Sequence, residues 1–221
     1  MCGRFTLAMD LEELQDAFPG VDFSLYLKPS YNIAPSRQVL VIPDFNAQKA
    51  LPFHWGLIPF WSKDKAIGYK MINARAETVH EKPSFKKPFR SQRCLIPADG
   101  FFEWKKTEGS KTPCYIRMKS GKPFAFAGLW EKWSPQGQDP IHSCTIITTS
   151  PNPLLADIHN RMPVILPPES HSTWLDTSID DPKSLSELLL PYSEEEMAAY
   201  PVSTFVNSPK NNSPDCIKPA S

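Results

Sequence analysis

The chain has 221 residues with 24 basic and 24 acidic side chains, so its formal net charge is zero. A neutral total argues against a protein that binds nucleic acid through bulk positive charge. Hydrophobic residues make up 41% of the chain and aromatic residues 11%, which excludes wholesale disorder. The 24 prolines, about twice the average usage, exclude a mostly helical protein.

The first predicted element is a helix over residues 10–18, with Asp10 and Glu13 as a capping box and Pro19-Gly20 as its stop. Short β-branched or aromatic runs bounded by Pro or Gly then predict strands at 38–42, 51–55, 93–96, 100–105, 114–118, 124–133, 143–149 and 163–166. Short helices are expected at 168–175, 182–190 and 194–199. Strands without regular intervening helices indicate an α+β or mostly-β fold.

Several classes of protein are disfavoured by what the chain lacks. No segment reaches the roughly 18 apolar residues of a membrane span, and the N-terminal residues lack the apolar core of a signal peptide. The five cysteines are widely spaced without a Cys-x-x-Cys pair, and no G-x-G motif occurs. We therefore expect a cytoplasmic protein with no metal, no cofactor and no membrane partner.

The charges are unevenly distributed along the chain. Residues 63–93 hold nine basic and three acidic side chains, whereas residues 176–200 hold one basic and seven acidic side chains. Two solvated faces would explain this pattern. The alternative is an anion-binding face kept apart from an acidic one.

Cys2 is the most informative candidate for chemistry. Removal of Met1 would leave it with a free α-amine and a thiol on adjacent carbons, which an internal cysteine does not have. With a pKa near ~8, the amine is partly neutral at pH 7 and forms a Schiff base with an aldehyde, on which the thiol closes a thiazolidine. The thiol could instead attack an amide carbonyl with the amine as its base. The alternative is a second residue without a function.

Segment 73–78 contains candidate binding residues. Asn73 can donate and accept hydrogen bonds, and Arg75 can grip a phosphate with its planar guanidinium. In extended geometry both would point to one face, together with Glu77. The alternative is a turn asparagine and a surface ion pair.

Two further residues are candidates for proton transfer. Glu103 lies among aromatic residues on a predicted strand, where desolvation would raise its pKa, unless it is exposed and paired with Lys105. His159 suits acid-base chemistry near neutral pH and lies beside Arg161, although a structural histidine is the alternative.

Aromatic and polar loops offer possible contacts to nucleic acid. Exposed aromatic rings stack on bases at about 1–3 kcal/mol each. We expect Trp55 in the core and Trp61, which borders the basic stretch, on the surface. The turn-rich segment 206–212 holds one lysine suited to a phosphate, Lys210.

Taken together and in order, six segments resemble the SOS-response-associated peptidase family, also called abasic-site processing proteins, and especially its bacterial and prophage members. They are Met1–Phe5, Tyr31–Pro35, Trp55–Pro59, Asn73–Thr78, Phe102–Lys105 and His159–Pro163. The resemblance runs from Cys2 to about Asn212. It implies a single α+β domain over residues 1–221, with a twisted, mainly antiparallel β-sheet or barrel-like core, short peripheral helices and a basic DNA-binding groove. We expect the last ten residues or so to form a flexible tail.

The resemblance also implies an activity and its catalytic residues. The substrate would be an abasic site in single-stranded DNA, including junctions with duplex. Cys2 would be the nucleophile that forms a thiazolidine crosslink with the ring-opened sugar, and Asn73 would position the sugar. Glu103 would be an acid/base, and His159 a second one linked to Schiff-base chemistry, β-elimination and crosslink reversal.

The remaining expectations from the resemblance concern DNA and processing. Arg4, Arg75 and Arg161 match phosphate-contacting positions, whereas Pro35 and Trp61 match residues that wedge or stack where bases leave a duplex. Phe60-Trp61 stands where some relatives have Trp-Trp, and stacking is expected to survive. The family name implies autoproteolysis that exposes Cys2. We expect a monomer that acts with the replication machinery and associates with the nucleoid when bound to DNA.

Two rival functions remain at this stage. Class-II glutamine amidotransferases also open with Met-Cys-Gly, but their Arg-Gly-Pro-Asp segment is absent and segment 73–78 has no counterpart in them. Release of ammonia from glutamine would identify that activity. The second rival is a non-covalent single-stranded DNA-binding module, which would form no stable adduct with abasic DNA.

Overall fold

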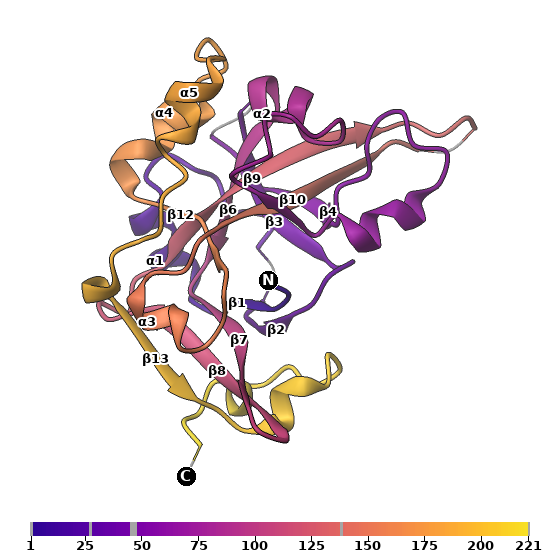
Figure 1. Ribbon diagram of the computed structural model, residues 1–221. Helices are drawn as coiled ribbons and strands as arrows, with labels where there is room; N and C mark the ends of the chain where they lie inside the picture. Colours follow the sequence, from indigo (N-terminus) through magenta and orange to yellow (C-terminus); the bar gives the residue numbers. More distant parts are fainter. Residues whose placement is uncertain (1, 27, 45–47, 138, 221) are drawn as a thin grey trace.

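Short strands make up most of the regular structure of the computed structural model, which describes residues 2–26, 28–44, 48–137 and 139–220 (Figure 1). The strands are β1 (Phe5–Leu7), β2 (Ser30–Ile33), β3 (Gln38–Pro43), β4 (Leu51–Trp55), β5 (Asn73–Arg75), β6 (Arg93–Ala98), β7 (Gly100–Thr107), β8 (Ser110–Met118), β9 (Phe124–Trp133), β10 (Ile141–Thr149), β11 (Met162–Pro163), β12 (Ile165–Leu166) and β13 (Met197–Pro201). The α-helices are α1 (Leu11–Ala17), α2 (Lys86–Ser91), α3 (Pro153–Ala156), α4 (His171–Leu175) and α5 (Pro182–Ser186). The 3-10 turns are η2 (Lys65–Lys70), η3 (Pro168–Ser170), η4 (Glu194–Glu196), η5 (Thr204–Asn207) and η6 (Pro214–Cys216).

One sheet closes on itself and forms the barrel-like core. Its strands follow the order β10-β4-β3-β6-β9, and β9 pairs again with β10, which completes the ring. The pairings are antiparallel except that β10 runs parallel to β4 and β5. The second sheet, in the order β13-β8-β7-β1-β2, is antiparallel throughout. The expected α+β fold with a mainly antiparallel, barrel-like core in a single domain is confirmed.

Three groups of buried side chains fill the spaces around these sheets. The first lies inside the barrel and joins Cys2 to Phe5, Trp55 and Phe101, with edge-to-face packing of Phe5 on Trp55 at 5.1 Å between ring centroids. A second group packs α1, α2 and α4 on the barrel. The third holds the C-terminal segment on β7 and β8. The expected core position of Trp55 is confirmed by its complete burial.

The N-terminal strand β1 is held firmly on β7 in the middle of the molecule (Figure 1). The buried Thr6 hydroxyl contacts the Asp99 carboxylate and lies 2.9 Å from the Tyr115 hydroxyl. Asp99 also accepts a hydrogen bond from the backbone N–H of Ala8 at 2.7 Å. Gly100 leaves the space that the Tyr115 ring fills, since a Cβ atom there would overlap the phenol. These contacts fix the start of the chain.

Most of the strands predicted from β-branched and aromatic runs are confirmed, with 51–55 and 124–133 at their predicted bounds. The helix over 10–18 is confirmed as α1 with its Asp10–Glu13 capping box. Three elements differ from prediction. The run 163–166 divides into β11 and β12, helix 182–190 ends at Ser186, and 194–199 is only one 3-10 turn followed by β13. The last was wrong because β13 pairs with β8 and buries Met197.

The C-terminal residues pack against the second sheet, in the segment where a flexible tail is expected from the sequence. Cys216 is fully buried, Val202 bridges Pro219, and the backbone N–H of Ala220 donates to the carbonyl of Pro201 at 2.9 Å. Within the described residues, no helix is both long and apolar enough to span a membrane.

We expect Gly100→Ala to lower the free energy of unfolding by about 1–3 kcal/mol, the usual cost of overpacking a rigid site. The added methyl meets a Tyr115 ring that is held by its hydrogen bond to Thr6. Denaturant unfolding measures the loss. In the comparison variant Gly128→Ala, the new methyl meets the ends of the Cys94 and Ile96 side chains, 2.8 and 2.9 Å away, which can shift. Equal losses in the two variants would contradict a rigid seat for β1.

Candidate functional site

Cys2 lies three residues before the start of β1 and is completely buried. The pairing of the N-terminal segment with β7 continues beyond β1, because the backbone N–H of Phe102 donates to the carbonyl of Arg4 at 2.9 Å. That same carbonyl lies 3.9 Å from the Cys2 Sγ atom. The fold thus carries the second residue of the chain into the barrel interior, and the thiol reaches the next residues of β7.

Glu103 and His159 meet beside Cys2. Glu103 lies on β7 and is only 3% exposed, so the alternative of an exposed ion pair with Lys105 is wrong. His159 follows α3, and its Nε2 atom lies 3.9 Å from Glu103 Oε2. The backbone of Arg161 holds the other ring nitrogen, because its N–H donates to His159 Nδ1 at 3.0 Å and its carbonyl lies 3.2 Å from the same atom, so Nε2 is the nitrogen that faces Glu103. The two side chains are therefore close enough to interact electrostatically, at a separation longer than a hydrogen bond.

Burial shifts the pKa values of all three groups. Desolvation raises the pKa of Glu103 to about 7 and lowers the pKa of His159 below its usual value. Burial, and then the nearby Glu103 carboxylate, raise the pKa of the Cys2 thiol well above its usual range. The carboxyl thus exchanges protons near neutral pH and the imidazole is neutral there, while the thiol keeps its proton until a base removes it.

Asn73 begins β5, which pairs in parallel with β10. Its Nδ2 atom donates to the carbonyl of Ile146 at 3.5 Å. Its Oδ1 atom is buried and has no hydrogen-bond partner among the residues that the structure describes. A buried acceptor without a partner is costly in a folded chain, so this oxygen is available to a donor on a ligand.

The three arginines expected to contact phosphate lie in different surroundings. Arg161 forms a bidentate ion pair with Glu77, with N–O distances of 2.5 and 2.9 Å, and also donates to the carbonyl of Thr148. Arg75 ends β5 with its side chain exposed. Arg4 donates to the side chain of Asn32 at 2.6 Å. Two of these guanidinium groups are therefore oriented before any ligand arrives, and Arg75 is the accessible one.

The other expected contact residues lie on loops. Pro35 is partly buried in the turn between β2 and β3, and Lys210 is exposed in the turn that follows η5. Trp61 is 49% exposed, as expected, and its neighbour Phe60 is 55% exposed with the Lys87 ammonium 4.7 Å from its ring centroid. No side chain of the Cys2, Glu103 and His159 cluster has a hydrogen bond or ion pair to these loop residues in the described ranges.

Two residues have roles that the sequence did not reveal. Asn32 belongs to the Tyr31–Pro35 segment, and the sequence predicts no separate role for it. Its Nδ2 lies within hydrogen-bond distance of three backbone carbonyls of segment 206–211 and holds that segment next to Arg4. Arg93 was counted in the basic stretch, but it is buried and donates to backbone carbonyls around α2 and α4. Its charge therefore does not contribute to a surface.

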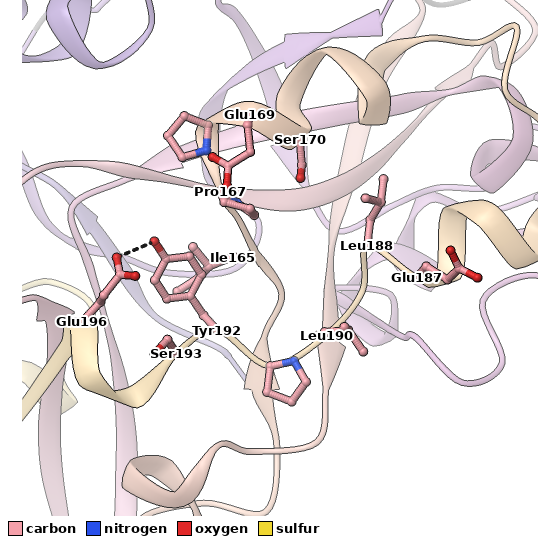
Figure 2. Close-up of a pocket in the computed structure, with 12 residues that line it drawn as sticks. Ile165, Pro167, Glu169, Ser170, Glu187, Leu188, Leu190, Tyr192, Ser193 and Glu196 are labelled. Carbon is pink, nitrogen blue, oxygen red and sulfur yellow. Dashed lines mark hydrogen bonds between the residues drawn. The ribbon is translucent and has the colours of Figure 1, made fainter.

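A pocket of about 470 Å³ lies away from this site, between η3 and the segment that follows α5 (Figure 2). Its lining includes the carboxylates of Glu169, Glu187 and Glu196, and Glu196 accepts a hydrogen bond from Tyr192 at 3.0 Å. Carboxylates repel a phosphate backbone, so this pocket is a poor site for DNA. In the described part of the chain, no three His, Cys, Asp or Glu side chains gather as ligands for a metal ion.

The family described as SOS response associated peptidase (SRAP) matches residues 1–209. The chain belongs to this family. It is similar to the abasic site processing protein YoqW of Bacillus subtilis strain 168, with 52% identity over 99% of both chains. YoaM of the same organism, another abasic site processing protein, is 50% identical over 98% of this chain and 97% of its own. A crystal structure of a Bacteroides thetaiotaomicron protein has a TM-score of 0.90 and 29% identity, and covers 100% of both chains.

The buried Glu103 of this SRAP chain makes its stability depend on pH. Its folded-state pKa of about 7 exceeds the ordinary value of 4.5, so between these values the folded state keeps a proton that the unfolded state has lost. The resulting stabilisation is complete below the unfolded value and is lost as the pH rises through the folded one. From about pH 4.5 to about pH 8, the free energy of unfolding of the wild type should fall by about 3 kcal/mol relative to Glu103→Gln.

Thermal or denaturant unfolding at several pH values measures this difference. Glu108→Gln is the control, because Glu108 is exposed at the tip of the β7–β8 hairpin and should leave the pH dependence of the wild type unchanged. Parallel pH profiles for the wild type and Glu103→Gln would contradict a raised pKa at Glu103.

Proposed function

We propose that this protein processes abasic sites in single-stranded DNA by capturing the sugar aldehyde covalently on Cys2 once Met1 is removed. The observation that carries the proposal is the burial of Cys2 beside Glu103, which in turn lies 3.9 Å from His159. A cysteine without a function at position 2 would not need an acid/base pair beside it. The names of YoqW and YoaM, similar over nearly the whole chain, support the same substrate.

The capture reaction needs one amine, one thiol and one proton donor. The α-amine of Cys2 adds to the aldehyde carbon of the ring-opened sugar and gives a carbinolamine. Protonated Glu103 donates its proton to the carbinolamine hydroxyl, which leaves as water, and an iminium ion forms. The carboxylate of Glu103 then takes the thiol proton, and the sulfur closes the thiazolidine. The products are the crosslink and one water molecule, and Glu103 is again protonated.

The shifted pKa values suit these steps. A carboxyl group with a pKa of about 7 is present in both forms near neutral pH, so Glu103 serves first as acid and then as base. The thiol, whose pKa is raised by burial, stays protonated until Glu103 has released its proton. Because the thiol then becomes a nucleophile only after the iminium ion exists, amine attack comes first.

The second acid/base, His159, serves the reactions that follow the iminium ion. Its lowered pKa keeps the imidazole neutral at pH 7, so it can remove a proton from the sugar carbon next to the iminium. Loss of the 3′ phosphate by β-elimination would make the protein a lyase. Protonation of the thiazolidine by the same group would reverse the crosslink. Autoproteolytic removal of Met1 belongs to the same proposal, because it exposes the α-amine of Cys2.

Other residues are assigned to the DNA strand. The unpartnered Oδ1 of Asn73 would accept a hydrogen bond from the sugar hydroxyl. Arg75 and Arg161 would hold a phosphate, and Arg4 would add positive charge behind Cys2. Exposed Trp61 would stack at a junction with duplex, where Pro35 and Lys210 would contact the strand. We propose a monomer that acts at replication forks, in the cytoplasm and on the nucleoid.

Purified protein whose lack of Met1 is verified by intact mass should form one heat- and SDS-stable adduct with an abasic oligonucleotide. Cys2→Ala should lose this adduct, because no thiol closes the ring. Its N-terminal amine remains, so borohydride should still trap a Schiff base. Gel mobility and intact mass measure both products.

Cys216→Ala is the matched control, since it removes a buried thiol elsewhere in the fold and should crosslink like the wild type. A stable adduct with Cys2→Ala, or none with processed wild type, would sink the proposed chemistry. Release of ammonia from glutamine by the wild type would favour an amidotransferase instead.

Arg75→Gln should weaken binding to single-stranded DNA and reduce the slope of log affinity against log salt by about 0.7, the value for one phosphate contact on a single strand. Arg75 is exposed on β5 and available to the backbone. Arg117→Gln provides the control, because Arg117 lies on β8 and donates to the carbonyl of Met118 at 3.1 Å. Fluorescence anisotropy over a salt series measures the slopes. If both variants keep the wild-type slope, Arg75 does not bind phosphate.

A further inference from the structure

A second pocket, of about 460 Å³, opens directly beside the Glu103 and His159 pair. Its other lining residues come from the β7–β8 hairpin and from η5, which is part of the C-terminal segment. They are Trp104, Lys106, Lys111 and Asn207. The hairpin side of this pocket had no expected function.

Lys106 and Lys111 face each other across the hairpin as register partners, and both are exposed. Like charges directly opposite in an antiparallel pair destabilise a sheet. In the described part of the chain neither lysine forms an ion pair, and the only carboxylate between them in sequence, Glu108, forms none either. The hairpin does not need the pair for closure, because the Thr107 and Ser110 hydroxyls already bond at 2.6 Å. The two charges are therefore available to an anion.

The wall of the pocket next to these lysines is held rigidly. The indole Nε1 of Trp104 donates to Asn207 Oδ1 at 2.8 Å, and the Arg4 guanidinium lies 5.8 Å from the centroid of the indole ring. Asn32 in turn ties the C-terminal segment to β2 through its three backbone contacts. Trp104 thus presents a fixed aromatic surface next to two free ammonium groups, which is a combination that suits a nucleotide.

The lysines and the arginines reach His159 from different elements. Arg161 follows His159 in the chain and donates to the carbonyl of Thr148, the register partner of Arg75 on β5. Lys106 and Lys111 come from the β7–β8 hairpin and share a pocket with His159. An abasic nucleotide inside a strand carries a phosphate on each side of its sugar, so a strand centred on the candidate site needs two phosphate-binding positions.

The geometry points to a second phosphate subsite, in which Lys106 and Lys111 bind the DNA backbone on one side of the abasic nucleotide and the adjacent nucleotide lies against Trp104. Arg75 and Arg161 hold the phosphate on the other side. This inference rests on the proposed function. It sets the path of the strand across the molecule, from the β5–β10 edge past His159 to the β7–β8 hairpin.

The test compares the double variant Lys106→Gln/Lys111→Gln with Lys119→Gln/Lys122→Gln. The second pair removes the same charge from exposed lysines in the turn between β8 and β9. For undamaged single-stranded DNA, the hairpin variant should bind about tenfold more weakly, with a salt slope reduced by about 0.7, the value for one phosphate contact. The turn variant should bind like the wild type. Equal losses in the two variants would overturn the subsite, because they would reflect only net charge.

A second measurement locates the phosphate. Two abasic oligonucleotides are used, one that extends from the lesion only in the 5′ direction and one only in the 3′ direction. The rate at which each is crosslinked is measured for the wild type and for the hairpin variant at subsaturating protein. The rate should fall in the variant with one of the two oligonucleotides and stay unchanged with the other. Equal effects on both would overturn the assignment. If the wild type crosslinks neither, the proposed function fails, while the salt slope on undamaged DNA still decides whether the lysines bind a backbone.

Discussion

The seating of β1 on β7 is the constraint on which the site depends. A chain terminus normally frays, yet Thr6, Asp99 and Tyr115 form a polar cluster that anchors the first strand, and Gly100 makes room for the Tyr115 ring. Because a strand fixes the spacing of its neighbours, the anchor at Thr6 also determines where Cys2 lies, four residues earlier. An amine and a thiol on one residue act together only if that residue is held against the acid/base groups.

Desolvation is the second constraint, because it shifts the pKa values of all three groups of the site. The same burial that keeps the Cys2 thiol protonated raises the pKa of Glu103 towards neutrality and lowers that of His159. In water the pKa of a glutamate lies below that of a histidine, whereas here the pKa of the carboxyl lies above that of the imidazole. The order of steps in the proposed chemistry, amine before thiol, then follows from solvent exclusion rather than from any special property of cysteine.

The sequence predicted the long strands and α1 because their apolar periodicity and caps are local signals, as in β9 and the capping box of Asp10. It missed β1, β2 and β5, since three or four residues show little periodicity and these strands are defined by their neighbours. The Glu-rich run 194–199 favoured a helix locally, and the pairing of β13 with β8 overrode it. The candidate residues came from motifs, but the contact of Glu103 with His159 spans segments that only the fold brings together.

Net charge is a poor guide to this molecule because the fold redistributes it. Arg93 contributes to the basic stretch in the sequence, but its buried guanidinium group donates its hydrogen bonds to backbone carbonyls. The charge of Arg161 is balanced by Glu77. Lys106 and Lys111 lie outside that stretch, line the same pocket as Glu103 and His159, and form no ion pair in the described part of the chain. A neutral protein can therefore present a cationic path without a cationic composition. Along such a path the unpaired charges attract a phosphate more strongly than Arg161 does, since its charge is already held by a carboxylate.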